Sequence, residues 1–155
     1  MQEPITTQPV DLLQDIEQDY HYKEASTGQR FANYIIDLVC FYIFIIGLFA
    51  VIVLVTGDDA VITWVDNLPI LVDRLIGLLM YGIFMALIEG FTNGRSVGKL
   101  ITGTRAMRWN DQSFGWGEAF GRGICRMVPF EPFSALGGNP WHDKWTDTRV
   151  VKNRL

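Results

Sequence analysis

A run of 25 residues from Phe31 to Val55 is almost entirely apolar and contains one charged side chain, Asp37. As a helix, such a run is about 37 Å long at about 1.5 Å per residue, which exceeds the roughly 30 Å hydrocarbon core of a membrane. An ionisable side chain inside a membrane helix is costly and marks a functional or paired position by default. The sequence therefore predicts a first membrane span over residues 30–55, with Asp37 as a candidate site residue.

A second apolar segment covers residues 68–91. Its centre, from Leu75 to Ile88, has no charged residue, and Glu89 follows directly. Gly77 and Gly82 are typical of membrane helices that pack against a neighbour. We predict a second span here.

Charged residues are distributed unevenly, although the net charge is only −4. Residues 1–30 carry six acids, residues 57–74 carry four, and the part after Phe91 carries ten Lys and Arg. Basic residues resist translocation across the membrane. Because the loop between the spans has only Arg74, we expect both termini in the cytoplasm, with residues 1–27 as an acidic cytoplasmic tail.

The segment after the second span is too basic for another crossing. Alternating residues and the turn at Asn110–Asp111 predict a strand over residues 101–107. Residues 146–151 suit a second short strand that pairs with it.

Residues 114–128 predict a third helix, which is amphipathic. Glu118, Arg122 and Arg126 recur every four residues and therefore share one face. This helix is too short and too charged to span, so we expect it on the cytoplasmic side, either in the interface or dipping into the helix bundle. The expected fold is an all-α membrane protein: one domain over residues 28–155, with two transmembrane helices, this helix, a short β-strand pair and an interfacial segment at 129–155.

Gly94 to Lys99 is similar to a phosphate-binding loop but does not meet its requirements. That loop needs four residues between its glycines and Ser or Thr after the lysine, whereas this segment has three and Leu100. We predict a tight turn that leaves the membrane. We expect the two basic side chains of this segment, Arg95 and Lys99, to lie near lipid headgroups. The same is expected of Arg105, which follows the segment.

The chain has no recognisable catalytic or metal-binding arrangement. His142 and Asp143 are sequence neighbours without a nucleophile at a recognisable spacing, and no Cys/His cluster has metal-ligand spacing. Cys40 and Cys125 are expected as reduced packing thiols. We therefore expect no enzymatic activity, no cofactor, no metal and no nucleic acid partner.

Several short motifs together resemble those of a known family. They are Arg30-Phe31-x-x-x-x-Ile36-Asp37, Gly94-x-Ser96-x-Gly98-Lys99-x-x-x-Gly103-x-Arg105, Arg122 with Arg126, His142-Asp143, and Thr148-x-Val150-Val151. Over roughly residues 30–152, this set resembles the RDD family of small prokaryotic membrane proteins, named for one arginine and two aspartates. The resemblance implies that Arg30, Asp37 and Asp143 are those three residues, and that the protein lies in the bacterial cytoplasmic membrane.

The resemblance also implies a fold more than a function. Transport roles have been proposed for the family, including sodium/proton exchange by some members. This chain departs from the family in one respect. The further hydrophobic crossing that members usually have after the third helix is represented here only by Pro129–Pro140.

The two spans and the third helix place six charged side chains near the cytoplasmic third of the membrane. Three acids are expected to be balanced by three bases: Asp37, Glu89 and Asp143 by Arg30, Arg122 and Arg126. One function that suits this cluster is a structural or accessory role in the membrane, which we favour. The other is transport of sodium ions, protons or a small solute through Asp37, which would need a homo-oligomer or a membrane partner subunit.

Overall fold

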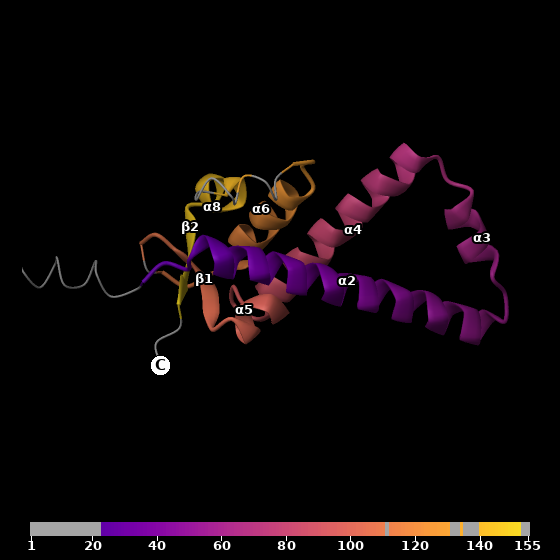
Figure 1. Ribbon diagram of the computed structural model, residues 1–155, viewed down its shortest axis with the longest axis horizontal. Helices are drawn as coiled ribbons and strands as arrows, with labels where there is room; N and C mark the ends of the chain where they lie inside the picture. Colours follow the sequence, from indigo (N-terminus) through magenta and orange to yellow (C-terminus); the bar gives the residue numbers. More distant parts are fainter. Residues whose placement is uncertain (1–22, 111, 131–133, 135–139, 153–155) are drawn as a thin grey trace, which may run out of the picture.

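The computed structural model describes residues 23–110, 112–130, 134 and 140–152, and the described part is mostly helical (Figure 1). Its elements are α2 (Thr27–Thr56), α3 (Ala60–Asp66), α4 (Ile70–Phe91), α5 (Val97–Ile101), β1 (Thr104–Arg108), α6 (Trp116–Arg126), α8 (Trp141–Trp145) and β2 (Thr148–Lys152). Helices α2 and α4 are both long and apolar enough to cross a membrane. The mostly helical fold with two candidate spans and a strand pair is thus confirmed.

Helix α2 begins one turn earlier than predicted because a capping box defines its start. Ser26 Oγ accepts a hydrogen bond from the backbone of Gln29 at 3.2 Å, and the Ser26 N–H donates to Gln29 Oε1 at 3.1 Å. The helix ends at Gly57, whose φ of 66° lies in the left-handed region that glycine adopts without strain. Apolar side chains such as Ile46 and Leu54, 67% and 84% exposed, cover its surface, which suits lipid rather than water.

Helices α2 and α4 meet near the sheet and diverge away from it, and α3 lies at the open end (Figure 1). They touch at a small apolar core in which the Phe41 and Tyr81 ring centroids are 5.3 Å apart, with Met85 beside them. Pro69 directly precedes α4, and its ring fixes the backbone φ at a value compatible with the start of a helix. Helix α3 was not expected from the sequence.

The predicted strand pair is present, and its bounds differ by a few residues. Strand β1 pairs antiparallel with β2, from Thr104 opposite Lys152 to Arg108 opposite Thr148. The chain before α2 also joins β2, since Ala25 N–H donates to the Val150 carbonyl at 2.9 Å. Residues 23–26, which we had assigned to the acidic tail, therefore pair with the sheet and cap α2, whereas residues 1–22 lie outside the described part.

Glycines allow the short elements to approach the spans closely. A Cβ added to Gly123 of α6 would lie 2.6 Å from the carbonyl oxygen of Gly82 in α4, and one added to Gly98 of α5 would lie 2.5 Å from that of Asn33 in α2. Both distances are shorter than a real side chain tolerates, so these crossings require glycine. The segment around Trp141 and Trp145, predicted only as part of the interfacial segment at 129–155, forms the short helix α8.

Candidate functional site

Asp37 lies on α2 and is 4% exposed, and α5 covers it. One carboxylate oxygen accepts a hydrogen bond from Ser96 Oγ at 2.6 Å, and the other accepts one from the Gly98 N–H at 2.7 Å. Ser96 is the N-cap residue of α5, so the carboxylate lies at the first turn of that helix. A helix start favours negative charge because its N–H groups point outward.

The segment from Gly94 to Lys99, which only partly matches a phosphate loop, binds this internal carboxylate. Gly94 has a φ of +83°, and a Cβ there would lie 2.4 Å from the Ala106 carbonyl oxygen. The tight turn brings α5 back against α2, where Gly98 contacts the backbone of Asn33. The segment therefore presents the Ser96 hydroxyl and the Gly98 N–H to Asp37.

Glu89, near the end of α4, is fully buried and contacts three cations. Lys99 Nζ and Arg126 Nη2 lie 2.8 Å and 2.7 Å from Oε1, and Arg122 Nε lies 2.9 Å from Oε2. These partners come from α5 and α6, so one carboxylate joins three helices. Such pairing is needed because an isolated buried charge is strongly unfavourable.

Asp143 on α8 forms the second centre of the network. Its two oxygens pair with Arg30 Nη1 and Arg122 Nη1, and His142 Nε2 lies 3.4 Å away. Burial alone raises the pKa of Asp143, but Arg122, His142 and Arg30 outweigh it and hold that pKa well below its usual range. Arg122 therefore bridges Glu89 and Asp143, and it also donates to Thr148 Oγ1 at 2.5 Å.

The structure links five of the six predicted cluster residues through ion pairs and places the sixth, Asp37, differently. Asp37 makes no ion pair within the described residues, although Lys99 and Arg126 influence it electrostatically. Its direct partners are the uncharged Ser96 and Gly98. The expected balance of Asp37 by an arginine is therefore replaced by hydrogen bonds to a helix start.

The prediction that Lys99 contacts lipid headgroups is wrong. Its side chain is 3% exposed and is paired with Glu89. Burial lowers the pKa of Lys99 to about 8, and Arg122 and Arg126 act in the same direction against the opposing effect of Glu89. Of the other two predicted headgroup residues, Arg95 is exposed and Arg105 is half-buried on β1, so their contact with lipid stays a prediction.

Sequence reasoning missed a second polar group beside the network. Asn33, which is 5% exposed, lies one turn before Asp37, and its amide contacts Thr102 Oγ1 at 2.5 Å and Thr104 Oγ1 at 3.0 Å. The spacing of Arg30, Asn33 and Asp37 along one face of α2 was the available signal. Within the described residues, no group of three or more His, Cys, Asp and Glu is arranged to hold a metal ion.

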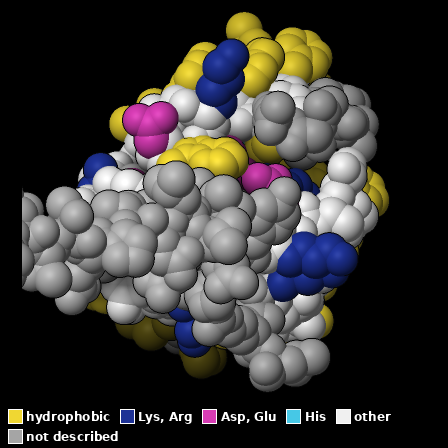
Figure 2. All heavy atoms as spheres, turned by 90° about the vertical axis from the view of Figure 1, so that its left-hand side faces the viewer, with side chains coloured by type: hydrophobic (Ala, Val, Ile, Leu, Met, Phe, Trp, Pro, Cys, Tyr) yellow, Lys and Arg dark blue, Asp and Glu magenta, His cyan; other side chains and the backbone are white. Residues whose placement is uncertain are grey.

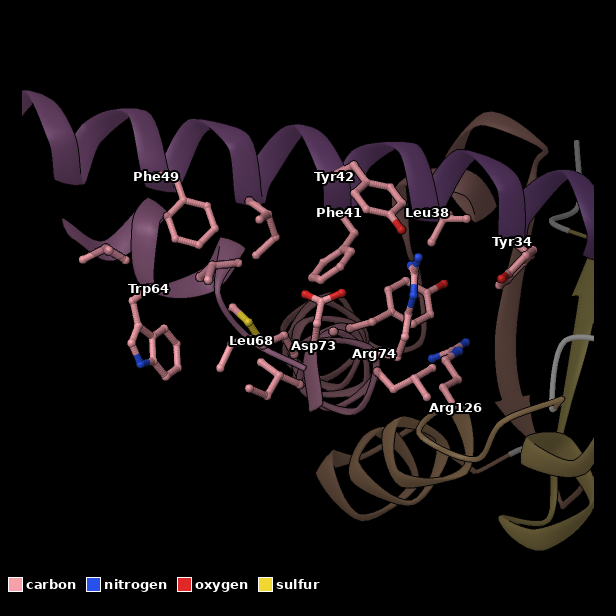
Figure 3. A pocket seen from close by; sticks show the side chains of 18 residues that line it. Tyr34, Leu38, Phe41, Tyr42, Phe49, Trp64, Leu68, Asp73, Arg74 and Arg126 are labelled. Atoms are coloured by element: carbon pink, nitrogen blue, oxygen red, sulfur yellow. The ribbon is translucent and has the colours of Figure 1, made fainter. Parts of the chain in front are cut away.

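A groove of about 480 Å³ lies between α2 and α4, with α3 at one end (Figure 3). Its walls are mainly aromatic and aliphatic, with Asp73, Arg74 and Arg126 among the lining residues. Asp73 and Arg74 point from α4 toward α2. Asp37 is not part of this lining.

The comparison with known families matches a large part of the chain. The model of the RDD family matches residues 24–146, which include both long helices, α5, β1, α6 and Asp143. No curated protein and no solved structure matches the chain. The family match and the two apolar helices together point to a membrane location. The chain belongs to the RDD family.

Proposed function

We propose that this RDD protein is a structural or accessory component of the bacterial cytoplasmic membrane. In this role the two spans anchor a polar platform, formed by α5, α6, α8 and the sheet, at the cytoplasmic face. The supporting observation concerns three buried carboxylates, those of Asp37, Glu89 and Asp143. In each of them, both oxygens contact hydrogen-bond donors or cations of the protein itself. A network satisfied in this way stabilises one arrangement of the helices.

The distribution of charge supports the proposed orientation. Residues 57–69, around α3, carry Asp58, Asp59 and Asp66 and no Lys or Arg, whereas ten of the thirteen Lys and Arg follow α4. Figure 2 shows basic and acidic side chains side by side on the end of the molecule that carries the sheet. The basic residues at this end favour its location in the cytoplasm. Its mixed charges could also be complemented by the polar surface of a membrane partner subunit or of a second copy.

The environment of the carboxylates also favours an accessory role over ion exchange. An exchanging carboxylate must be reached by its ion from water. Neither Asp37 nor Glu89 is among the residues that line the groove between the spans, and both are almost completely buried. Release of either group for ion binding would break two or more direct contacts.

The test is reconstitution of the purified protein into vesicles with an imposed proton or sodium gradient. We expect no dissipation of the gradient by the wild-type protein. We also expect Arg122→Ala to give a smaller yield of folded protein than the wild type, and Arg95→Ala, at an exposed position, to leave the yield unchanged. A flux that Asp37→Asn abolishes in a folded sample would contradict the accessory role.

One observation supports transport as a second candidate function. Asp37 is a carboxylate within a span, and its direct partners, Ser96 and Gly98, are uncharged. Its negative charge is therefore not neutralised by an ion pair within the described residues, and a proton or sodium ion could compensate it. In the same vesicles, flux that depends on Asp37 and requires an oligomer would support this function.

A further inference from the structure

The groove between α2 and α4 has the dimensions of a ligand site. Its volume of about 480 Å³ lies in the range of about 300–1,000 Å³ typical of sites for small molecules. One face of α2 forms its long wall, with Tyr34, Leu38, Phe41, Ile45 and Phe49 in the lining. This wall extends about 22 Å at about 1.5 Å per residue, which suits an extended hydrocarbon chain.

The groove is partly open at its side, and the surrounding helix surfaces are apolar and exposed. In a protein with two membrane spans, a groove of this kind opens toward lipid rather than water. Trp64 of α3 lies in the lining at the end where the helices are farthest apart (Figure 3). An occupant can therefore enter from the bilayer without passing through the polar platform.

Positive charge predominates among the charged residues of the groove. Arg126 lines the groove and also belongs to the ion-pair network through Glu89. The other charged lining residues are Asp73 and Arg74, so the lining carries two cations and one carboxylate. An anionic headgroup beside Arg126 would complement this charge.

We propose that this groove binds one anionic phospholipid of the surrounding bilayer, with an acyl chain along α2 and the phosphate beside Arg126. The inference rests on the membrane insertion proposed above. Arginine suits this contact because its guanidinium presents several donors to phosphate oxygens. The lipid fills the space that the diverging helices leave and connects the polar platform to the cytoplasmic leaflet.

Gly77 allows a direct test, because it lines the groove and a Cβ added there meets no atom within 4 Å. Gly77→Phe places an aromatic ring in the groove from a position where the Cβ itself meets no neighbour. Gly47→Phe is the matched control, since Gly47 lies on α2, is equally open, and is not part of the lining. Arg126→Gln and Arg126→Lys test the charge of the headgroup site.

Native mass spectrometry of the full chain, with equal amounts of phosphatidylglycerol and phosphatidylcholine added, measures the bound lipid. We expect one phosphatidylglycerol per chain, retained at least tenfold more than phosphatidylcholine. Gly77→Phe should reduce this retention at least tenfold, and Gly47→Phe should leave it unchanged. Arg126→Gln should abolish the preference for the anionic lipid, and Arg126→Lys should restore it.

Three results would overturn the inference: equal retention of the two lipids, unchanged retention in Gly77→Phe, or a dimer that Gly77→Phe dissociates. Co-purification of a free fatty acid in place of the phospholipid would overturn it as well. Extraction of membranes with alkaline carbonate tests insertion separately. A chain that stays in the membrane but retains no phosphatidylglycerol contradicts the lipid site alone, whereas a chain that is washed off contradicts the proposed function.

Discussion

Arg122 and Glu89 are both completely buried and form an ion pair, with Nε and Oε2 2.9 Å apart. They come from α6 and α4, whose backbones approach closely at Gly82 and Gly123. The close approach and the ion pair depend on each other, because a bulky residue at the crossing would separate the charges. The same arginine continues to Asp143, so the closing part of the chain is tied to the second span through one side chain.

Arg122→Ala is expected to be among the most destabilising substitutions in the protein. It leaves Glu89 with two cations and Asp143 with one arginine, and loss of one partner from a buried ion pair costs about 3–5 kcal/mol. The free energy of unfolding in detergent micelles measures this loss. The control is Arg108→Ala, because Arg108 contacts Glu118 at 3.5 Å with a partly exposed side chain, and such pairs contribute about 0–1 kcal/mol. Equal losses in the two variants would contradict the importance of the network.

Ser96→Ala should weaken the contact between α5 and α2. The hydroxyl group both donates to Asp37 and accepts a hydrogen bond from the Lys99 N–H at the start of α5. Loss of an N-cap side chain costs about 0.5–2 kcal/mol, and we expect the upper part of that range because Asp37 also loses a donor. Ser96→Thr keeps the hydroxyl and should recover most of the stability. A full loss in Ser96→Thr, measured by the same unfolding assay, would show that the side-chain volume matters more than the hydrogen bonds.

The membrane-spanning helices and the strands were predictable because the sequence patterns that specify them are local. The apolar run around α2 and the alternating residues of the strands specify their structure within a few residues of sequence. Helix α5 has only five residues, and the sequence predicted a tight turn followed by the start of a strand in its place. Its conformation depends on Asp37 and Asn33, which lie far away in the chain.

The partners within the network could be predicted only in part. The spacing along α6 indicated that Arg122 and Arg126 face the spans, where acids had to be neutralised. Lys99 was placed at the lipid surface because basic residues next to a span usually lie there. The turn at Gly94 reverses the chain and returns Lys99 to Glu89 in the protein interior, and no periodic pattern reveals such a contact.

Gly98→Ala should separate α5 from α2. The added Cβ would lie 2.5 Å from the Asn33 carbonyl oxygen, and this backbone atom cannot move away independently. Overpacking of this kind costs about 1–3 kcal/mol. Gly77→Ala is the control in a span, where the added methyl group meets nothing within 4 Å. Thermal unfolding should show a lower midpoint for Gly98→Ala alone, and an unchanged midpoint in both variants would contradict the close contact.

Lys99 should make the stability depend on pH in the alkaline range. Its pKa is about 8 in the folded protein, compared with an ordinary value of 10.5. Between these values the unfolded chain binds more protons, so the free energy of unfolding should rise with pH. Below about pH 8 the buried amine is charged in both states, and this contribution is constant. Lys99→Met lacks the titrating group, so the difference in free energy of unfolding between wild type and Lys99→Met should shift in favour of the wild type from pH 8 to pH 10. A difference that is independent of pH over this interval would show that Lys99 keeps its ordinary pKa in the folded protein.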